Sequence, residues 1–125
     1  MNEHEEAFAR RFVAPDRRSR YVTLLSSKRG RQKVVANLPH FGDLDFRFAI
    51  EVTNETRSEI RKLLLEKGAP KTCYVMSGDT EWDGMEISFE DALNEVAFHS
   101  EGTLMSFIPG KLAYFELEGL ESASS

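Results

Sequence analysis

The chain has 125 residues, a length typical of one domain, and its 41% hydrophobic and 30% charged residues exclude global disorder. Its single cysteine, Cys73, excludes an intrachain disulfide and stands in an apolar run, as expected of a core residue in a reducing compartment. No apolar run reaches the roughly 18 to 20 residues that span a bilayer, and the acidic N-terminus does not resemble a secretory signal, so we expect a cytoplasmic protein without a membrane partner.

The N-terminal third is predicted to be helical. Asn2 can cap a first helix, in which Phe8 and Phe12 lie four positions apart on one face, and Pro15 ends it. A second helical stretch opens at Pro15. Its apolar residues are expected to face inward and its three arginines to point away from them, namely Arg17, Arg18 and Arg20.

The pattern changes period after a third helix. Residues 26–30 interrupt the second helix, and the third carries the apolar stripe of Val34, Val35 and Leu38. Residues 46–52 then alternate apolar and polar side chains, which predicts a half-buried strand. Thr53 or Asn54 is expected to cap a fourth helix, whose buried stripe is Ile60, Leu63 and Leu64.

The C-terminal half predicts a sheet. Residues 73–76 form a continuous apolar run, typical of a strand buried on both faces, and Asp83-Gly84 is a turn pair. Ser88 is expected to cap a fifth helix that runs through Phe98. Two strands over 103–108 and 112–117 flank Pro109-Gly110, and such neighbours pair antiparallel.

These elements predict an α+β fold. About three short helices form the N-terminal third, and they pack with a three- to four-stranded, mostly antiparallel sheet and two further helices. Residues 1–118 are expected to form a single domain, followed by a flexible tail over 119–125.

The charge is distributed unevenly. Residues 1–33 hold nine Lys/Arg and four Asp/Glu, a net of +5, whereas residues 34–125 have a net of −10. One hypothesis is a face for nucleic acid or another anion, with two helices broken at residues 27–30 as in a helix-turn-helix. The other is a basic face that is solvated or paired with the acidic remainder of the same chain. The pI of about 5.2 opposes nucleic acid, because the acidic remainder would repel it. The candidate contacts are Arg17, Arg18, Arg20, Lys28, Arg29, Arg31 and Lys33.

An acidic loop offers a candidate metal site. Over residues 79–90 the sequence resembles the calcium loop of an EF-hand, with oxygen ligands at alternate positions and a glycine at the sharp turn. Glu81 stands where the shorter Asp or Asn is usual, and the preceding residues predict a strand where an EF-hand has a helix. The alternative is a hairpin loop whose carboxylates face water. The candidate ligands are Asp79, Glu81, Asp83 and Glu90.

The same loop carries two large apolar residues. Trp82 and Met85 flank the turn, and an exposed Trp beside Met is a typical anchor for a protein partner. The alternative is that both side chains fold back into the core.

No catalytic constellation stands out. His40, Asp43 and Asp45 lie close in sequence and His99 follows a predicted helix end, but spacing alone does not bring them together. The nucleophile-elbow pattern G-x-S-x-G and a Gly-rich phosphate loop are both lacking, although Ser106 and Cys73 are residue types that act as nucleophiles. We therefore assign no catalytic residue and no cofactor.

The sequence favours a non-catalytic protein-interaction or regulatory module, whose partner is another protein or a second copy of itself. The first alternative is a nucleic-acid-binding protein that uses the basic segment 10–33. The second is a calcium-binding module or an enzyme that uses the acidic loop 79–90.

Overall fold

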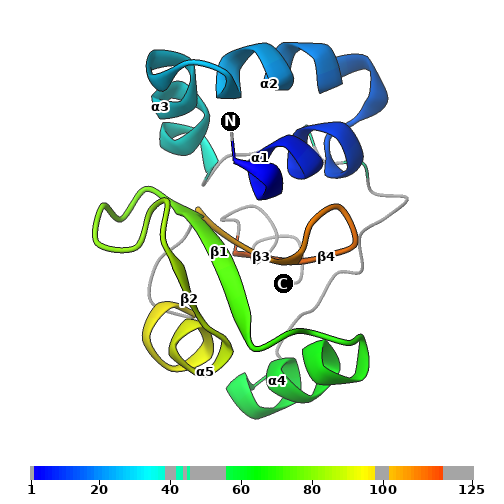
Figure 1. The fold of residues 1–125 in the computed structure, drawn as a ribbon, viewed down its shortest axis with the longest axis vertical. Coiled ribbons are helices and arrows are strands. Elements are labelled where there is room, and N and C mark those ends of the chain that lie inside the picture. The colour runs from blue at the N-terminus through cyan, green and yellow to red at the C-terminus, as the bar shows by residue number, and fades with distance from the viewer. Residues whose placement is uncertain (1, 39–41, 44, 46–55, 98–101, 117–125) are drawn as a thin grey trace.

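The fold is seen in a computed structural model that describes residues 2–38, 42–43, 45, 56–97 and 102–116. The N-terminal third is helical, as predicted (Figure 1). Its elements are α1 (Glu3–Ala7), the π-helical turn η1 (Phe8–Phe12), the 3-10 turn η2 (Pro15–Arg17), α2 (Arg18–Leu25) and α3 (Lys28–Ala36).

Caps explain where these helices begin. The Asn2 side chain accepts from the backbone N–H of His4, and the Ser27 side chain accepts from that of Gly30. The break between α2 and α3 is therefore confined to Ser26 and Ser27, and the prediction that it continues to Gly30 is wrong. Gly30 is buried inside α3, where its missing side chain lets the α2 backbone come close.

Four strands form one antiparallel sheet in the order β2-β1-β3-β4. Tyr74 of β1 lies opposite Ser106 of β3, and the turn between β3 and β4 holds Gly110 at a φ of 70°. The strands are β1 (Thr72–Ser77), β2 (Glu86–Ser88), β3 (Thr103–Ile108) and β4 (Leu112–Glu116).

Two helical layers cover the two faces of the sheet (Figure 1). One face packs against the N-terminal helices through a cluster that includes Phe8, Leu25, Val34, Tyr74 and Met76. The other face packs against the remaining helices, α4 (Arg57–Glu66), α5 (Phe89–Asp91) and the π-helical turn η5 (Ala92–Val96). Since β1 lies inside the sheet and between both layers, the prediction of a strand buried on both faces is confirmed.

The start of α4 differs from the prediction. The cap of α4 is Thr56, not Thr53 or Asn54, and Thr56 forms a capping box with Glu59. Ile60 and Leu64 of the predicted stripe are buried, whereas Leu63 is only half-buried. Ser88 caps α5 through the backbone N–H of Asp91, as predicted. The helical segment ends at Val96 and not at Phe98 as predicted, because Ala97 already has an extended backbone.

The α+β class is thus confirmed, with the helical N-terminal third, the antiparallel sheet and two further helical segments. The strand predicted over 46–52, the tail over 119–125, and His40 and His99 lie outside the described residues. No helix in the described ranges has the length and apolar character needed to cross a bilayer.

Candidate functional site

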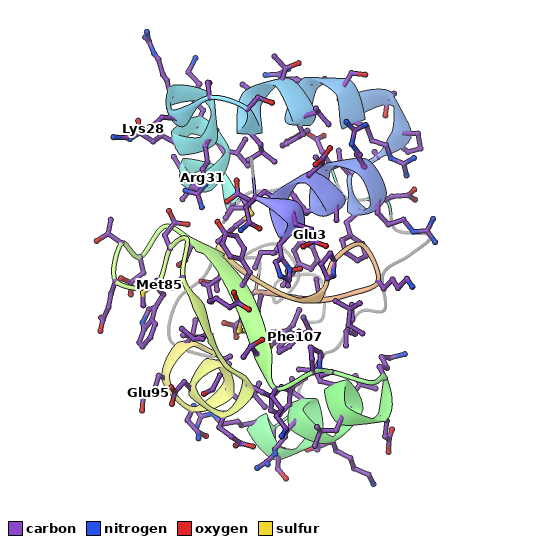
Figure 2. The ribbon with its side chains drawn as sticks, viewed as in Figure 1. Glu3, Lys28, Arg31, Met85, Glu95 and Phe107 are labelled. Atoms are coloured by element: carbon purple, nitrogen blue, oxygen red, sulfur yellow. The ribbon has the colours of Figure 1, made fainter. Side chains whose placement is uncertain are left out.

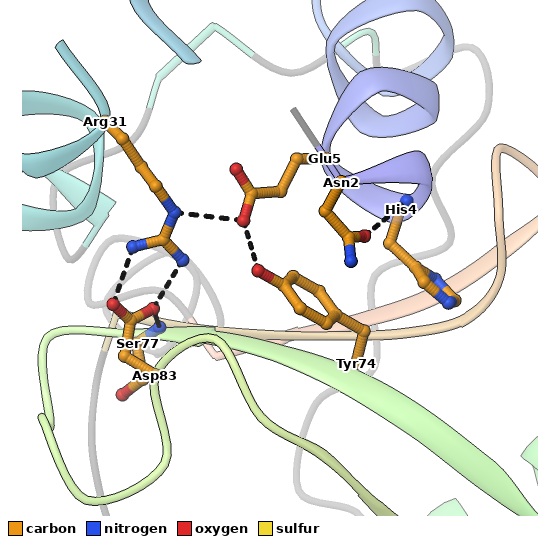
Figure 3. Close-up of polar contacts among 7 residues, drawn as sticks. All are labelled: Asn2, His4, Glu5, Arg31, Tyr74, Ser77 and Asp83. Atoms are coloured by element: carbon orange, nitrogen blue, oxygen red, sulfur yellow. Dashed lines mark hydrogen bonds and ion pairs between the residues drawn. The ribbon is translucent and has the colours of Figure 1, made fainter. Parts of the chain in front are cut away.

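A buried polar network joins the N-terminal helices to the sheet (Figure 3). Arg31 of α3 lies at its centre. Its Nε donates to Glu5 Oε2 at 2.9 Å, and its Nη1 and Nη2 donate to the two carboxylate oxygens of Asp83 at 2.7 and 2.8 Å. Tyr74 donates its hydroxyl hydrogen to the same Glu5 oxygen, and the backbone N–H of Ser77 donates to Asp83 at 3.0 Å. The network connects α1, α3, β1 and the loop before β2.

Complementary charges hold this network together. The Glu5 side chain is 4% exposed and that of Arg31 is 22% exposed, so both have lost most of their water. The hydrogen bond to Asp83 is the largest influence on Arg31 and raises its pKa above the usual value, even though burial lowers it. Burial, followed by the hydrogen bond to Glu5, raises the pKa of Tyr74 to about 12. At physiological pH, Arg31 is therefore charged and Tyr74 is neutral.

A histidine and a serine meet beside this network. His4 Nδ1 and Ser106 Oγ are hydrogen-bonded at 2.7 Å, and the His4 ring stacks on Tyr74 with centroids 5.4 Å apart. These are residue types of nucleophilic catalysis. However, Ser106 is only 2% exposed, and no carboxylate among the described residues orients the His4 ring. We interpret the pair as a packing contact between α1 and β3.

Cys73 is a core residue, as predicted. Its side chain is 1% exposed on β1, within the cluster that faces α4 and α5. Burial, followed by the charge of Glu86, raises its pKa to about 12. The thiolate, which is the reactive form, is therefore scarce at neutral pH.

The acidic loop does not gather its carboxylates. Asp83 pairs with Arg31, while Glu90 pairs with Arg61 on α4. Asp79 accepts from the backbone N–H of Glu81, a contact within the loop itself. In the part of the chain that the structure describes, no group of three His, Cys, Asp or Glu side chains is placed to hold a metal ion. The calcium hypothesis thus lacks a converging ligand set.

The two apolar residues of this loop have different surroundings. Trp82 is half-buried and packs against the core cluster that also contains Phe89 and Leu93. Met85 is 45% exposed (Figure 2). An anchor formed by both side chains together is therefore not presented, because the larger one contributes to the core.

The basic segment divides into inward and outward side chains. Arg31 points toward the sheet, whereas Lys28, on the same helix, points away from it (Figure 2). Arg18 was expected to point outward, but its Nε donates to Val13 O at 2.9 Å and its Nη2 to Asp45 Oδ2 at 3.2 Å. Five of the seven candidates are exposed, and we call them the basic surface: Arg17, Arg20, Lys28, Arg29 and Lys33.

A hollow of about 330 Å³ lies between η1 and α2, on the helical layer that carries the basic surface. Two guanidinium groups, two hydroxyl groups and one apolar side chain line it, namely Arg10, Arg18, Ser19, Thr23 and Val22. Its polar lining is thus dominated by groups that attract an anion.

The sequence did not indicate the buried network. Sequence patterns predict other roles for Arg31 and Asp83 and do not single out His4, Glu5 or Tyr74. Their contacts join positions that are 26 to 102 residues apart. No local spacing in the sequence predicts such contacts. The acidic charge of the remaining chain, and an arginine on the inner side of a basic helix, are consistent with these ion pairs.

No family model, curated protein or solved structure matches this chain. Functional inference for this chain therefore depends on the geometry of its own side chains.

Proposed function

We propose that this chain is a non-catalytic binding module that docks an acidic segment of a partner protein on the basic surface of its N-terminal helical layer. The carrying observation is the separation of the basic residues into two groups. Arg18 and Arg31 are paired with Asp45, Glu5 and Asp83 inside the molecule. The five residues of the basic surface face solvent, without an ion pair to any described residue.

The density of positive charge supports this proposal. Between positions 10 and 33 the only acidic residue is Asp16, so the exposed cations have little local compensation. Charged surfaces of one sign attract a complementary partner and accelerate its association. The remainder of the chain is strongly acidic, so the basic surface also gives the molecule a defined polarity.

A protein partner fits this surface better than a nucleic acid. A polynucleotide extends beyond the patch and meets the acidic remainder of the chain, whose net charge from residue 34 onward is −10. Arg31, whose planar fork is suited to bidentate recognition, is already bonded to Asp83 through both terminal nitrogens. A short acidic peptide segment covers only the patch and avoids this repulsion.

Fluorescence anisotropy with a labelled oligoglutamate peptide tests the proposal. The triple variant Arg20→Glu, Arg29→Glu and Lys33→Glu replaces attraction by repulsion at three exposed positions. Since exposed charge pairs contribute up to about 1 kcal/mol each, we expect the affinity to fall by about tenfold or more.

The matched control is the triple variant Lys62→Glu, Lys67→Glu and Lys71→Glu, which changes the net charge equally at exposed positions on and after α4. It should bind the peptide nearly as well as the natural chain. Equal losses in both triple variants, or no binding by the natural chain, would refute the proposal. Tighter binding of an oligonucleotide than of the peptide at physiological salt would favour the nucleic-acid alternative.

A further inference from the structure

The hollow between η1 and α2 contains a guanidinium group that is held in place before any ligand binds. Arg18 donates through Nε to Val13 O at 2.9 Å and through Nη2 to Arg11 O at 3.4 Å. Nη2 also donates to Asp45, whose side chain is 4% exposed, at 3.2 Å. The Nη1 hydrogens have no partner among the described residues. Arg18 therefore offers two fixed donors, at little cost in side-chain entropy.

Arg10 provides a second guanidinium group, which is only loosely engaged. Its Nε donates to Glu6 Oε1 at 3.1 Å, and the two side chains are 62% and 47% exposed. An ion pair this exposed contributes little free energy. A ligand that carries more negative charge than the single Glu6 carboxylate can take its place on Arg10.

Side chains of α2 complete the hollow. Ser19 provides a hydroxyl donor in the first turn of the helix, while the Thr23 hydroxyl donates to the Ser19 carbonyl oxygen at 3.0 Å. Val22 provides an apolar wall. Donors from Arg10, Arg18 and Ser19 thus surround a space that is larger than a carboxylate requires.

We propose that this hollow binds a phosphate monoester, presented as a phosphorylated side chain within the acidic segment of the partner; this rests on the proposed function. A phosphate monoester has a charge of about −1.5 to −2 near neutral pH and three terminal oxygens. Its three oxygens correspond to the three donor side chains. A carboxylate, with the same single charge as Glu6, gains little by replacing it on Arg10.

The test compares three probes by isothermal titration calorimetry: an acidic peptide with a central phosphoserine, the same peptide with serine, and inorganic phosphate. For the natural chain we expect the phosphopeptide to bind about tenfold more tightly than the serine peptide. Equal affinities for the two peptides would overturn the proposal.

Two matched variants locate the phosphate. Ser19→Glu places a carboxylate in the hollow, and an acidic residue is well tolerated in the first turn of a helix. It should abolish the preference for the phosphopeptide while leaving the binding of the serine peptide nearly unchanged. Gln32→Glu adds the same charge at an exposed position of α3 and should retain the preference. A preference that survives in Ser19→Glu would overturn the assignment to this hollow.

A third variant removes the competing carboxylate. Glu6→Gln leaves Arg10 without its ion-pair partner, so we expect the phosphopeptide to bind several-fold more tightly. A purely structural role of Arg10 would not produce such a gain in affinity. Inorganic phosphate separates the two proposals. If it shifts the backbone amide resonance of Ser19 while neither peptide binds, the hollow takes free phosphate and the docking function is refuted.

Discussion

Arg31 shows how much a single side chain can decide in a small domain. Its guanidinium group pairs with two carboxylates that are far apart in the sequence, those of Glu5 and Asp83, and offsets much of the hydration that each has lost. Glu5 in turn accepts the hydrogen of Tyr74, so removal of the cation affects every member of the network. The arginine thereby links the helical layer to the sheet through polar contacts in addition to the apolar cluster.

Replacement of this arginine should be strongly destabilising. Arg31→Ala leaves Glu5 and Asp83 as partly or fully buried charges without their cation, a change that typically costs about 3 kcal/mol or more. Urea denaturation monitored by circular dichroism measures this loss. Arg29→Ala removes an exposed arginine from the same helix, and it should change stability by less than about 0.5 kcal/mol. Similar stabilities for the two variants would contradict the role assigned to Arg31.

The junction of α2 and α3 depends on a close approach of two backbones. A Cβ atom at Gly30 would lie 2.2 Å from the carbonyl oxygen of Leu24, far inside van der Waals contact. Ser27 caps α3 one turn earlier, so the chain reverses within two residues and the two helices pack closely. This packing sets the positions of the basic surface on one helix relative to the other.

Gly30→Ala should therefore destabilise the protein even though alanine has the higher helix propensity. Since a backbone atom is in the way, the helices must move apart, and we expect a loss of about 2 kcal/mol or more. Gly78→Ala is the control, because a Cβ at Gly78 meets nothing within 4 Å and its φ is not positive. Thermal melting of both variants distinguishes the two sites. A Gly30→Ala variant as stable as the natural chain would contradict the close approach of the α2 and α3 backbones.

At the scale of the molecule, packing of the helical layers on the sheet buries titratable groups partly or fully, on α2 as well as on the strands. All three tyrosines of the sequence have a pKa above the usual value of 10. Burial is the largest cause for each, followed at Tyr21 by a hydrogen bond to Asp43, at Tyr74 by one to Glu5, and at Tyr114 by the charge of Glu116. Cys73 behaves in the same way.

These shifts predict a loss of stability at alkaline pH. Because the folded-state pKa values exceed the unfolded ones, folding favours the neutral forms, and their contribution is complete below the unfolded values of 9 for Cys73 and 10 for tyrosine. It is lost as the pH rises from there toward about 12, the folded value for Cys73 and Tyr74. Urea midpoints across this range should fall, and Tyr74→Phe should make the fall less steep. A constant midpoint would contradict the burial of these groups.

Local patterns were sufficient to predict most of the elements. These patterns reflect interactions between residues close in sequence. Examples are the apolar spacing of residues 34, 35 and 38, the polar caps before helix starts, and the turn at Gly110. The errors fell at helix ends. Thr56, and not an earlier residue, caps α4 because its capping box with Glu59 satisfies two backbone N–H groups at once, those of Thr56 and Glu59.

The candidate site was predicted only in part, for a physical reason. Composition indicated that positions 10 to 33 form a basic segment, but not which of its residues face inward, since that depends on how each helix lies on the sheet. Arg18 and Arg31 turn toward buried carboxylates, and Lys28, Arg29 and Lys33 do not. Paired and exposed cations look alike in a sequence.

The sequence by itself determined the α+β class, the order of the helices and strands, and the separation of basic and acidic charge along the chain. Only the tertiary structure decided which charges meet, because the contacts of Arg31 with Glu5 and Asp83 and of His4 with Ser106 join distant positions. Secondary structure arises from interactions over a few residues, and these are encoded in local patterns. Ion pairs and hollows arise where separate layers pack, and their positions follow from the geometry of the whole fold.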